Sequence, residues 1–370
     1  MRDTMGVSLL TAVLVLSVVA VPVGAVTTAE TPETSGDSVG ECTFPVTMTD
    51  ATGTDVTLSE EPTRIVTVNP SAAQILWEIG AREKVVGLSK YAANLEGAES
   101  RINVSTTENI ANAEKVVGAE PDLVLVPNAT SEETVQQLRE AGLTVYHFSE
   151  AETMEDIQSD VKTTGRLVGA CAGAEKTVAE MERDLDVVRE TVEGEDRPDV
   201  LYSFYGYTAG EGTFVHTIIE TAGGNNVAAD ANITGYKPVN EEFVVDANPD
   251  WIIRNSDTPE VPQRDAYNIT TAVKEGQVVV VQIEHLNRPG PRVVNAVTKL
   301  AKTFHPEAYA AANATETATP TAEPTPETTA ASTSDGESET ETSAPGFGVL
   351  SVLSAAAALG AASMLRRRRR

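Results

Sequence analysis

Two stretches of the chain form an internal repeat: Glu114-Lys-Val-Val-Gly-Ala-Glu-Pro-Asp-Leu-Val-Leu matches Glu242-Phe-Val-Val-Asp-Ala-Asn-Pro-Asp-Trp-Ile-Ile at an offset of 128 residues. Each copy has the pattern of a short helix, a Pro-Asp turn and a buried strand. Residues 123–126 and 251–253 are continuous apolar runs, as expected of parallel strands that are covered on both faces. Two copies so far apart predict two similar α/β lobes.

Strand and helix patterns alternate around both copies, which is typical of a parallel sheet. In the first half we expect a hairpin over residues 44–58, strands over 64–68, 84–88 and 143–148, and helices over 72–79 and 130–141. Ser71 is the expected cap of the first of these helices. In the second half we expect strands over 200–202 and 277–283 and helices over 213–222 and 292–303.

A long helix is predicted between the two repeat copies. Residues 152–168 are helical in pattern, and residues 174–192 place Val178, Met181, Leu185 and Val188 at helical spacing with charges between them. Nineteen residues give a rod of about 28 Å. The predicted fold is therefore α/β, with two similar α/β lobes whose central sheets are mainly parallel, joined by one long backbone helix.

Composition divides the chain further. We expect a signal peptide at 1–25, a spacer and hairpin at 26–61, an N-terminal lobe at 62–152, a helical region with the linking helix at 153–196, a C-terminal lobe at 197–311, a Thr/Glu/Pro-rich stalk at 312–344 and a sorting or membrane tail at 345–370. The stalk composition cannot bury a core. These boundaries follow from changes in composition and pattern alone.

Both ends of the chain carry targeting features. Arg2 and the apolar run at residues 7–26 predict a secretory signal peptide cleaved near Ala25, with an uncleaved anchor as the alternative. Either one exports the rest. At the other end, Pro345-Gly346-Phe347, an apolar stretch of about 27 Å and five arginines resemble the PGF-CTERM signal of archaeal surface proteins. That resemblance implies removal of the tail by an archaeosortase and its replacement by a lipid; a plain transmembrane anchor is the alternative.

The chain is strongly acidic, with a formal net charge of −28. Such a charge excludes a nucleic-acid partner, because there is no basic surface to displace counterions from phosphates. It is typical of a halophile, in which carboxylates keep the surface hydrated in concentrated salt; selection of a cationic ligand is the alternative. Asn-x-Ser/Thr sequons, which agree with an exported glycoprotein, begin at Asn103, Asn128, Asn232, Asn268 and Asn313.

Catalytic and metal-binding patterns are sparse. Cys42 and Cys171 are too few for a disulfide scaffold, although an oxidising compartment allows them to pair and the sequence leaves their distance open. The histidines lack metal-ligand spacing, and Ser203 lacks a nucleophile elbow. We therefore expect no catalytic residue, no metal site and no cofactor. The rival hypotheses are a cell-surface hydrolase that uses His285 with nearby acids, and an adhesin or envelope-structure protein suggested by the stalk.

Ligands of open α/β lobes lie beyond the carboxyl ends of the strands. Aromatic residues concentrate at one such position, where we expect Tyr202 and Phe204 on opposite faces of a strand, one of them in the core. Tyr205 and Tyr207 are the better candidates for stacking on a large conjugated ligand, although all four rings could simply pack the lobe. The predicted ligand-binding residues are Asn69, Ser71, Tyr91, Asn128, Tyr205, Tyr207, Arg254, His285 and Arg288.

Several segments, in this order, resemble one known family: Arg64-Ile-Val-Thr-Val-Asn-Pro-Ser-Ala-Ala-Gln-Ile-Leu, Val85-Val-Gly-Leu-Ser-Lys-Tyr, Pro121-Asp-Leu-Val-Leu-Val, Gly223-Gly-Asn-Asn-Val-Ala and Arg288-Pro-Gly-Pro-Arg-Val-Val. The family is the helical-backbone substrate-binding proteins of ABC importers, and the resemblance covers about residues 60–310. It implies a ligand between the lobes, little hinge closure, and a metal chelate as cargo: cobalamin, a ferric siderophore or haem, the ligand itself carrying cobalt or iron. It also implies a permease and its ATPase as partners. We expect a monomer at the cell surface, on the outer face of the cytoplasmic membrane.

The same resemblance gives the repeat a role. In the cobalamin binders one surface glutamate per lobe, seven residues before such a proline, meets arginines of the permease, and Glu114 and Glu242 stand at those positions. The alternative is that they are acids favoured by a helix dipole. Tyr91 occupies the position of an aromatic residue that packs on cobalamin. A second aromatic position of that family is Pro127 here, a departure that argues against cobalamin itself.

Overall fold

The computed structural model describes residues 42–106 and 111–318, which belong to one compact unit. The predicted signal peptide, residues 26–41 of the spacer, the stalk beyond residue 318 and the tail all lie outside the described residues. Within the described part of the chain, no helix is both long enough and apolar enough to cross a membrane.

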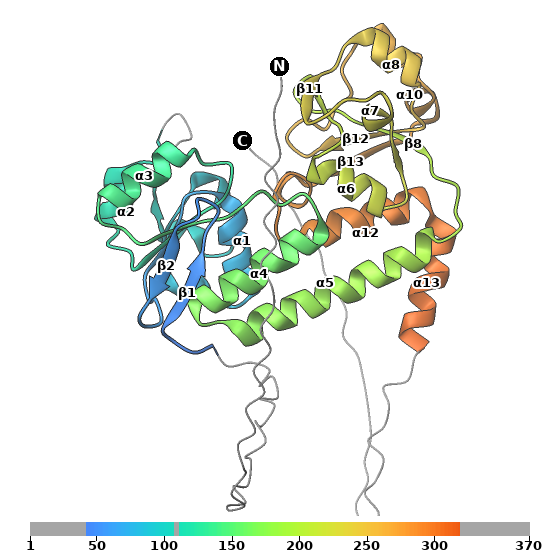
Figure 1. Cartoon of the computed structure of the whole chain (residues 1–370). Helices are drawn as coiled ribbons and strands as arrows, with labels where there is room; N and C mark the ends of the chain where they lie inside the picture. Colours follow the sequence, from blue (N-terminus) through green and yellow to red (C-terminus); the bar gives the residue numbers. More distant parts are fainter. Residues whose placement is uncertain (1–41, 107–110, 319–370) are drawn as a thin grey trace, which may run out of the picture. The chain divides into compact units, whose positions relative to one another are not determined.

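The N-terminal lobe is built on a parallel five-stranded sheet in the order β5-β4-β3-β6-β7 (Figure 1). Strands β3, β6 and β7 are fully buried, which explains the continuous apolar sequence of β6, Leu123–Val126. The elements of this lobe are the predicted antiparallel hairpin β1 (Val46–Thr49) and β2 (Asp55–Leu58), the sheet strands β3 (Ile65–Thr67), β4 (Val85–Leu88), β5 (Ile102–Asn103), β6 (Leu123–Val126) and β7 (Val145–His147), and the helices α1 (Pro70–Glu78), α2 (Ala113–Gly118) and α3 (Glu132–Glu140).

The start of α1 differs from the prediction. Ser71 does not cap the helix; it lies in the first turn and is buried, while Asn69 occupies the N-cap position without a side-chain capping bond. The cause is Pro70, whose fixed φ angle favours the first helical position and moves the start towards the N-terminus.

The C-terminal lobe repeats the design with four parallel strands in the order β10-β8-β12-β13. A small antiparallel pair, β9 with β11, lies outside this sheet. The elements are β8 (Asp199–Tyr202), β9 (Tyr207–Ala209), β10 (Asn225–Asn226), β11 (Tyr236–Pro238), β12 (Trp251–Asn255), β13 (Val278–Val281), α6 (Phe214–Thr221), α7 (Val227–Asp230), α8 (Glu241–Ala247), α9 (Asp265–Asn268), α10 (Thr271–Glu275) and α11 (Ile283–Leu286). The two sheets are separate, as the two-lobe prediction requires.

Four helices connect and support the lobes: α4 (Met154–Val168), α5 (Cys171–Val192), α12 (Val293–Phe304) and α13 (Pro306–Ala318). Helix α5 is the predicted long helix and has 22 residues, a length of about 33 Å. It packs against α1 and α4, which precede it in the chain, and against α12 and α13, which follow the C-terminal sheet (Figure 1). Helix α13 continues past residue 311, where we expected the stalk to begin, and Ala312 is buried.

One apolar core runs through both lobes. A single cluster of buried side chains includes Ile65 and Leu125 from the first sheet, Leu185 from α5, and Ile253 and Val281 from the second sheet. Two smaller clusters lie within single lobes, one beside β6 and α3 and the other beside β12 and α9. The shared core joins the lobes as one folded body.

The sequence repeat is also a structural repeat. Helices α2 and α8 both begin at an asparagine whose side chain accepts a hydrogen bond from a backbone N–H, Asn112 at 2.9 Å and Asn240 at 2.7 Å. Shortly after each helix one residue adopts a positive φ angle, Glu120 at 49° and Asn248 at 36°. The two copies therefore have the same local design, beyond their sequence similarity.

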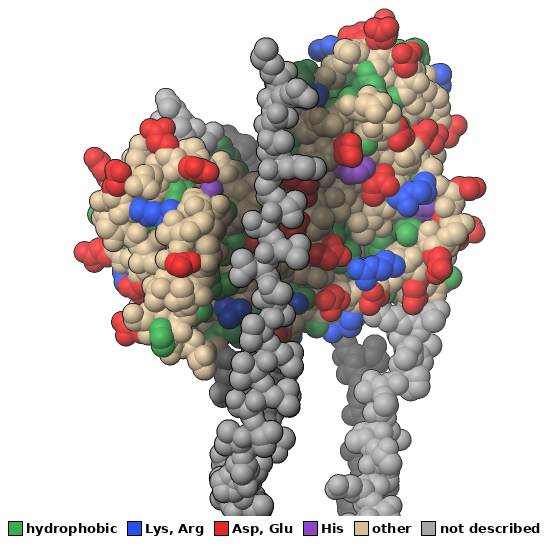
Figure 2. Space-filling view, viewed as in Figure 1, with side chains coloured by type: hydrophobic (Ala, Val, Ile, Leu, Met, Phe, Trp, Pro, Cys, Tyr) green, Lys and Arg blue, Asp and Glu red, His purple; other side chains and the backbone are tan. Residues whose placement is uncertain are grey.

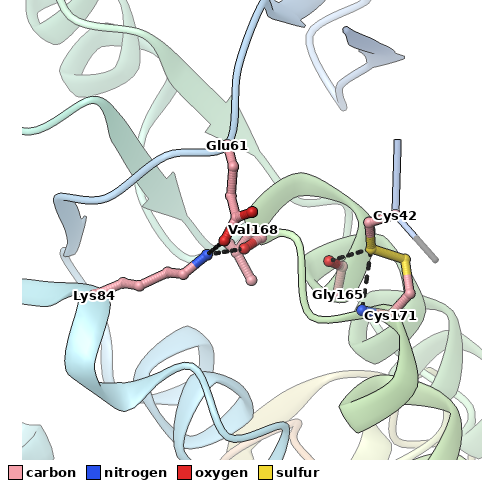
Figure 3. Close-up of a disulfide and its surroundings, with 6 residues drawn as sticks. All are labelled: Cys42, Glu61, Lys84, Gly165, Val168 and Cys171. Atoms are coloured by element: carbon pink, nitrogen blue, oxygen red, sulfur yellow. Dashed lines mark hydrogen bonds and ion pairs between the residues drawn. A yellow bond between two sulfur atoms is a disulfide. The ribbon is translucent and has the colours of Figure 1, made fainter. Parts of the chain in front are cut away.

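A disulfide joins Cys42 to Cys171, so the pairing that the sequence allowed is present (Figure 3). The two Cα atoms are 5.6 Å apart and 129 residues apart in sequence. Because Cys171 is the first residue of α5, the bond fastens the start of the described chain to the long helix. Nearby, Lys84 donates to the carboxylate of Glu61 and to the carbonyl of Val168 (Figure 3).

Candidate functional site

In each sheet there is a topological switch point, where successive strands are added first on one side of a strand and then on the other. In the first sheet the chain leaves β3 for β4 on one side and later returns to β6 on the other. In the second sheet β8 has β10 on one side and β12 on the other. Loops at such switch points separate beyond the carboxyl ends of the strands and leave room for a ligand. The loops after β3, β6, β8 and β12 therefore flank the candidate ligand-binding space.

A small cavity lies beside the first switch point. Ser71, just after β3, and Asn128, just after β6, both line it, together with Asp160 of α4. Pro289 from the C-terminal lobe completes the lining, so the cavity lies between the lobes. Its volume of about 10 Å³ is enough for one water molecule. The structure thus brings together two of the predicted ligand residues.

Asp160 is a cavity residue that sequence reasoning missed. Burial raises the pKa of its carboxyl group from the ordinary 3.8 to about 7, and repulsion from Asp156 adds to the shift. In a chain with 55 acidic residues, no sequence pattern singles out this one. A carboxyl group with this pKa changes its charge near neutral pH, so the cavity can be either neutral or anionic under mild conditions.

A larger hollow of about 390 Å³ lies beside the second switch point. It is lined by Tyr205 and Gly206 after β8, by Arg254 and Thr258 at the end of β12, and by Val239, Asn240, Glu241, Pro262, Arg264 and Tyr267. Two of the predicted ligand residues, Tyr205 and Arg254, therefore share one hollow. Tyr205 has a positive φ angle of 46°, uncommon for an aromatic residue, and its side chain is 64% exposed.

Arg254 is a buried cation without an acidic partner among the residues that the structure describes. It is 4% exposed, its Nε donates to the carbonyl of Thr258 at 2.9 Å, and its Nη1 donates to the backbone carbonyl of Ser203 and to the hydroxyl of that residue at 2.9 Å. No carboxylate of the described residues forms an ion pair with it. Burial lowers the pKa of the guanidinium. Because an unpaired buried charge is costly, the hollow favours an anionic group.

Aromatic rings gather around Phe204. Its ring centroid lies 5.0 Å from that of Tyr202, 6.2 Å from Tyr205, 6.3 Å from Tyr207 and 5.8 Å from Tyr236. The prediction that Tyr202 and Phe204 face opposite ways is wrong: they stack on the same side, because residues two apart in a strand share a face. Tyr202 is the core member.

Three tyrosines of this cluster remain accessible. Tyr205, Tyr207 and Tyr236 are 64%, 44% and 42% exposed. Sequence reasoning missed Tyr236, which stands alone in the sequence and joins the others only because β11 pairs with β9. The three rings offer a surface on which a flat, conjugated ligand can stack.

Two predicted ligand residues instead connect the lobes to each other. Arg288 donates from Nη2 to the carbonyl of Tyr91 at 2.8 Å and from Nη1 to Oδ1 of Asn94 at 2.9 Å. The ring of Tyr91 stays 44% exposed. Close by, Arg292 pairs with Glu78 at 2.7 Å. Arg288 and Arg292, which follow β13, thus connect the C-terminal lobe to the segment after β4 and to α1.

The remaining two predicted residues line neither hollow. Asn69 and His285 are both half-buried. Burial lowers the pKa of His285, and Glu284 partly opposes that shift. Among the described residues, no three His, Cys, Asp or Glu side chains gather in a way that could hold a metal ion. The described residues of these hollows offer a stacking surface and polar contacts for a ligand.

On the face that Figure 2 shows, surface charge does not mark one binding patch. Figure 2 shows carboxylates spread over the visible face of the described body, with few lysines and arginines between them. An even distribution of this kind fits hydration of the whole surface better than selection of one cationic ligand.

Comparison with known proteins identifies the class. Residues 65–283 match the family model for periplasmic binding proteins, so the chain belongs to that family. The chain is 44% identical over 349 residues to a protein of Halobacterium salinarum named cobalamin-binding protein, covering 91% of this chain and 92% of that protein. It is 30% identical to YvrC of Bacillus subtilis, an uncharacterized ABC transporter substrate-binding lipoprotein, covering 72% of this chain and 87% of the other.

A solved structure agrees with the fold. The periplasmic heme-binding protein RhuT from Roseiflexus sp. RS-1 superposes with a TM-score of 0.61 at 26% identity, covering 66% of this chain and 98% of that one. The predicted fold class, two α/β lobes joined by a backbone helix, is confirmed. These relatives are binding proteins, in agreement with the expectation that the chain is not an enzyme.

Proposed function

We propose that this chain captures a corrinoid outside the cell and delivers it to an ABC importer. The observation that carries the proposal is the 44% identity to a protein named cobalamin-binding protein over 92% of that protein's length. Coverage this complete includes both lobes and the linking helix. It outweighs the departure at Pro127, which is one lining position of a small cavity.

The geometry supports a bulky ligand with an anionic group. A corrin ring can stack on Tyr205, Tyr207 and Tyr236. Arg254 lies in the hollow that Tyr205 also lines, and it can receive the phosphodiester that cobalamin carries outside its ring. Both features come from the loops at the second switch point.

The other predicted residues complete the proposed site. Asn69, Ser71, Asn128 and His285 offer polar contacts to amide groups of the ligand. Tyr91 contributes an exposed ring. Arg288 acts mainly by holding the backbone of Tyr91 in place.

The repeat supports docking on a permease through Glu114 and Glu242. Both glutamates are exposed in the first turn of their helices, α2 and α8. Three residues after each, Val117 and Val245 are both 41% exposed. Each lobe therefore offers an exposed carboxylate beside an exposed apolar side chain. Two equal features suit a transporter with two similar subunits, whose arginines would pair with the glutamates.

Export and anchoring complete the proposal. The sequence supports a signal peptide, a lipid attached at the PGF-CTERM tail, a monomeric state, glycosylation and life in concentrated salt. Family membership and the lipoprotein relative agree with a binding protein that works outside the cytoplasmic membrane.

A second candidate cargo is haem or a ferric siderophore. The specific observation is the similarity to RhuT, a heme-binding protein, at a TM-score of 0.61. Exposed tyrosines can coordinate iron through their phenolates, and Arg254 can meet a carboxylate. The residue types at the second switch point suit this cargo as well.

The test is binding by the purified body, residues 42–318, in molar salt. Cyanocobalamin, dicyanocobinamide, haemin and a ferric siderophore are titrated while Trp and Tyr fluorescence is recorded. Micromolar or tighter binding of cyanocobalamin, with weaker binding of haemin and the siderophore, is the expected result. Tighter binding of haemin or the siderophore would favour the second candidate, and no binding by any of the four would overturn the proposal.

A further inference from the structure

The sequons of this chain differ in how accessible the structure leaves them. N-glycosylation joins a glycan to the asparagine of Asn-x-Ser/Thr, and the transferring enzyme must reach both the amide and the hydroxyl. Four of the five sequons have both side chains in the described part of the chain; for the fifth, at Asn313, the side chain of the third residue lies outside it. Exposure and hydrogen bonding at the four differ sharply.

The sequon at Asn128 conflicts with the fold. Asn128 is half-buried and lines the cavity between the lobes, whose volume is about 10 Å³. Asp160 and Pro289 of the other lobe line the same cavity, which is far too small for a sugar. The half-buried position and the nearby Pro289 therefore disfavour a glycan on Asn128 in the folded protein.

Two more sequons have a hydroxyl that the fold hides. Ser105, the third residue of the Asn103 sequon, is 5% exposed, and its hydroxyl accepts a hydrogen bond from the N–H of Lys90 at 3.1 Å. Thr270, the third residue of the Asn268 sequon, is 1% exposed and donates its hydroxyl to the carbonyl of Tyr267 at 2.7 Å. In both cases the group that an enzyme must recognise already has a partner inside the protein.

The sequon Asn232-Ile-Thr differs from the other three because its first and third residues are both accessible. Asn232 and Thr234 are both exposed, and neither side chain hydrogen-bonds to another described residue. The backbone is nevertheless well held: the N–H of Asn232 donates to Ala229 at 2.8 Å and that of Ile233 donates to Ala228 at 3.0 Å. The site is a fixed backbone with two free polar side chains.

The fold explains why asparagine stands at position 232, but it does not explain the threonine at position 234. Asn232 has a φ angle of 59°, and asparagine is favoured in that left-handed conformation after a helix, here α7. Thr234 has no such reason, because its exposed hydroxyl forms no hydrogen bond with another described residue. Recognition from outside accounts for both residues together.

We propose that Asn232 is the N-glycosylation site of the C-terminal lobe. The Nδ2 atom of Asn232 forms a bond to the anomeric carbon of an oligosaccharide carried on a lipid phosphate; the lipid phosphate leaves, and the Nδ2 proton passes to a base of the transferring enzyme. The inference requires only that the chain is exported, so it does not depend on which chelate is bound.

The test is glycopeptide mass spectrometry of the full chain purified from its own organism, with four variants. The wild type carries a glycan on the peptide that contains Asn232. Thr234→Ser keeps the glycan and Thr234→Ala loses it while Asn232 stays in place. Asn232→Gly also loses it, and glycine tolerates the positive φ angle, so this variant folds. Asn268→Gln is the matched control and leaves the modification unchanged.

Two results would overturn the inference. One is an unmodified Asn232 peptide from the wild-type protein. The other is a glycan on Asn103 or Asn268 in its place. Cyanocobalamin titration of the same preparations reports on the proposed function separately, because the loss of a glycan at Asn232 leaves Tyr205 and Arg254 untouched.

Discussion

Arg288 and Tyr91 belong to different lobes, and the guanidinium of Arg288 donates to the carbonyl oxygen of Tyr91 at 2.8 Å. A second tie lies close by, where the amide of Gln74 donates to the carbonyl of Glu284 at 3.1 Å and accepts from the N–H of Arg292 at 3.3 Å. Gly290 allows this approach, since a Cβ there would lie 2.5 Å from Oε1 of Gln74. Polar ties and a shared core together fix the spacing of the lobes.

Replacing Gln74 by leucine is expected to destabilise the fold. Gln74 is fully buried, and leucine would leave a backbone carbonyl and a backbone N–H without partners. Each such group costs about 1–3 kcal/mol. Urea denaturation in molar salt measures the change in the free energy of unfolding. Gln137→Leu, at an exposed position of α3, is the control; an equal effect of both variants would contradict the assignment.

Breaking the Cys42–Cys171 disulfide is expected to lower stability and to leave cargo affinity unchanged. The bond closes a loop of 129 residues, and its removal should cost about 2–4 kcal/mol. The measurement compares the denaturation of the wild type with that of the Cys42→Ser/Cys171→Ser variant, with and without reductant. Reductant should shift only the wild type. A shift of the double variant would mean that reduction acts elsewhere.

Removing an exposed ring of the aromatic cluster is expected to weaken corrinoid binding. Tyr205→Ala and Tyr236→Ala should each raise the Kd roughly tenfold, or about 1.4 kcal/mol, because a stacking surface is lost. Titration by fluorescence or calorimetry measures the effect. Tyr309→Ala on α13, outside the cluster, is the matched control. Unchanged affinity in both variants would remove the cluster from the site.

The pKa of Asp160 predicts how stability depends on pH. Its value of about 7 in the folded protein lies above the ordinary 3.8, so between about pH 4 and pH 7 the folded chain holds a proton that the unfolded chain has released. The free energy of unfolding should therefore fall as pH rises through this window. Asp160→Asn should flatten that slope, whereas Asp184→Asn at an exposed position of α5 should not. Parallel slopes in wild type and Asp160→Asn would refute the assignment.

Docking through the paired helices can be separated from cargo binding. Glu114→Ala combined with Glu242→Ala should leave the Kd for cargo unchanged and reduce cargo uptake by whole cells. Val117→Asp combined with Val245→Asp should do the same, because exposed apolar contacts are replaced by charge. Glu132→Ala combined with Glu275→Ala is the control. Wild-type uptake by the glutamate variant would remove these residues from the interface.

The architecture was accessible from the sequence because the signals were local and repeated. Apolar runs marked the buried strands β6 and β12, and helical spacing marked α5. Details that depend on competing local effects were less accessible. Pro70 displaced the expected cap at Ser71, and the two-residue period of a strand put Tyr202 and Phe204 together.

The candidate site was only partly accessible, because its members meet through long-range contacts. Strand ends pointed to Ser71 with Asn128 and to Tyr205 with Arg254, and each pair shares a hollow. Nothing local marks Asp160 or Tyr236, since an acid is ordinary in this chain and β11 pairs with a distant strand. The role of Arg288 in tying the lobes required knowledge of which backbone it faces.

The unbroken apolar interior also has an evolutionary consequence. Neither half of this protein is expected to be stable alone, because its removal would expose the flank of α5 around Leu185 and Val188 to water. A change of ligand is therefore expected to come from the loops at the strand ends, where substitutions leave this common interior intact.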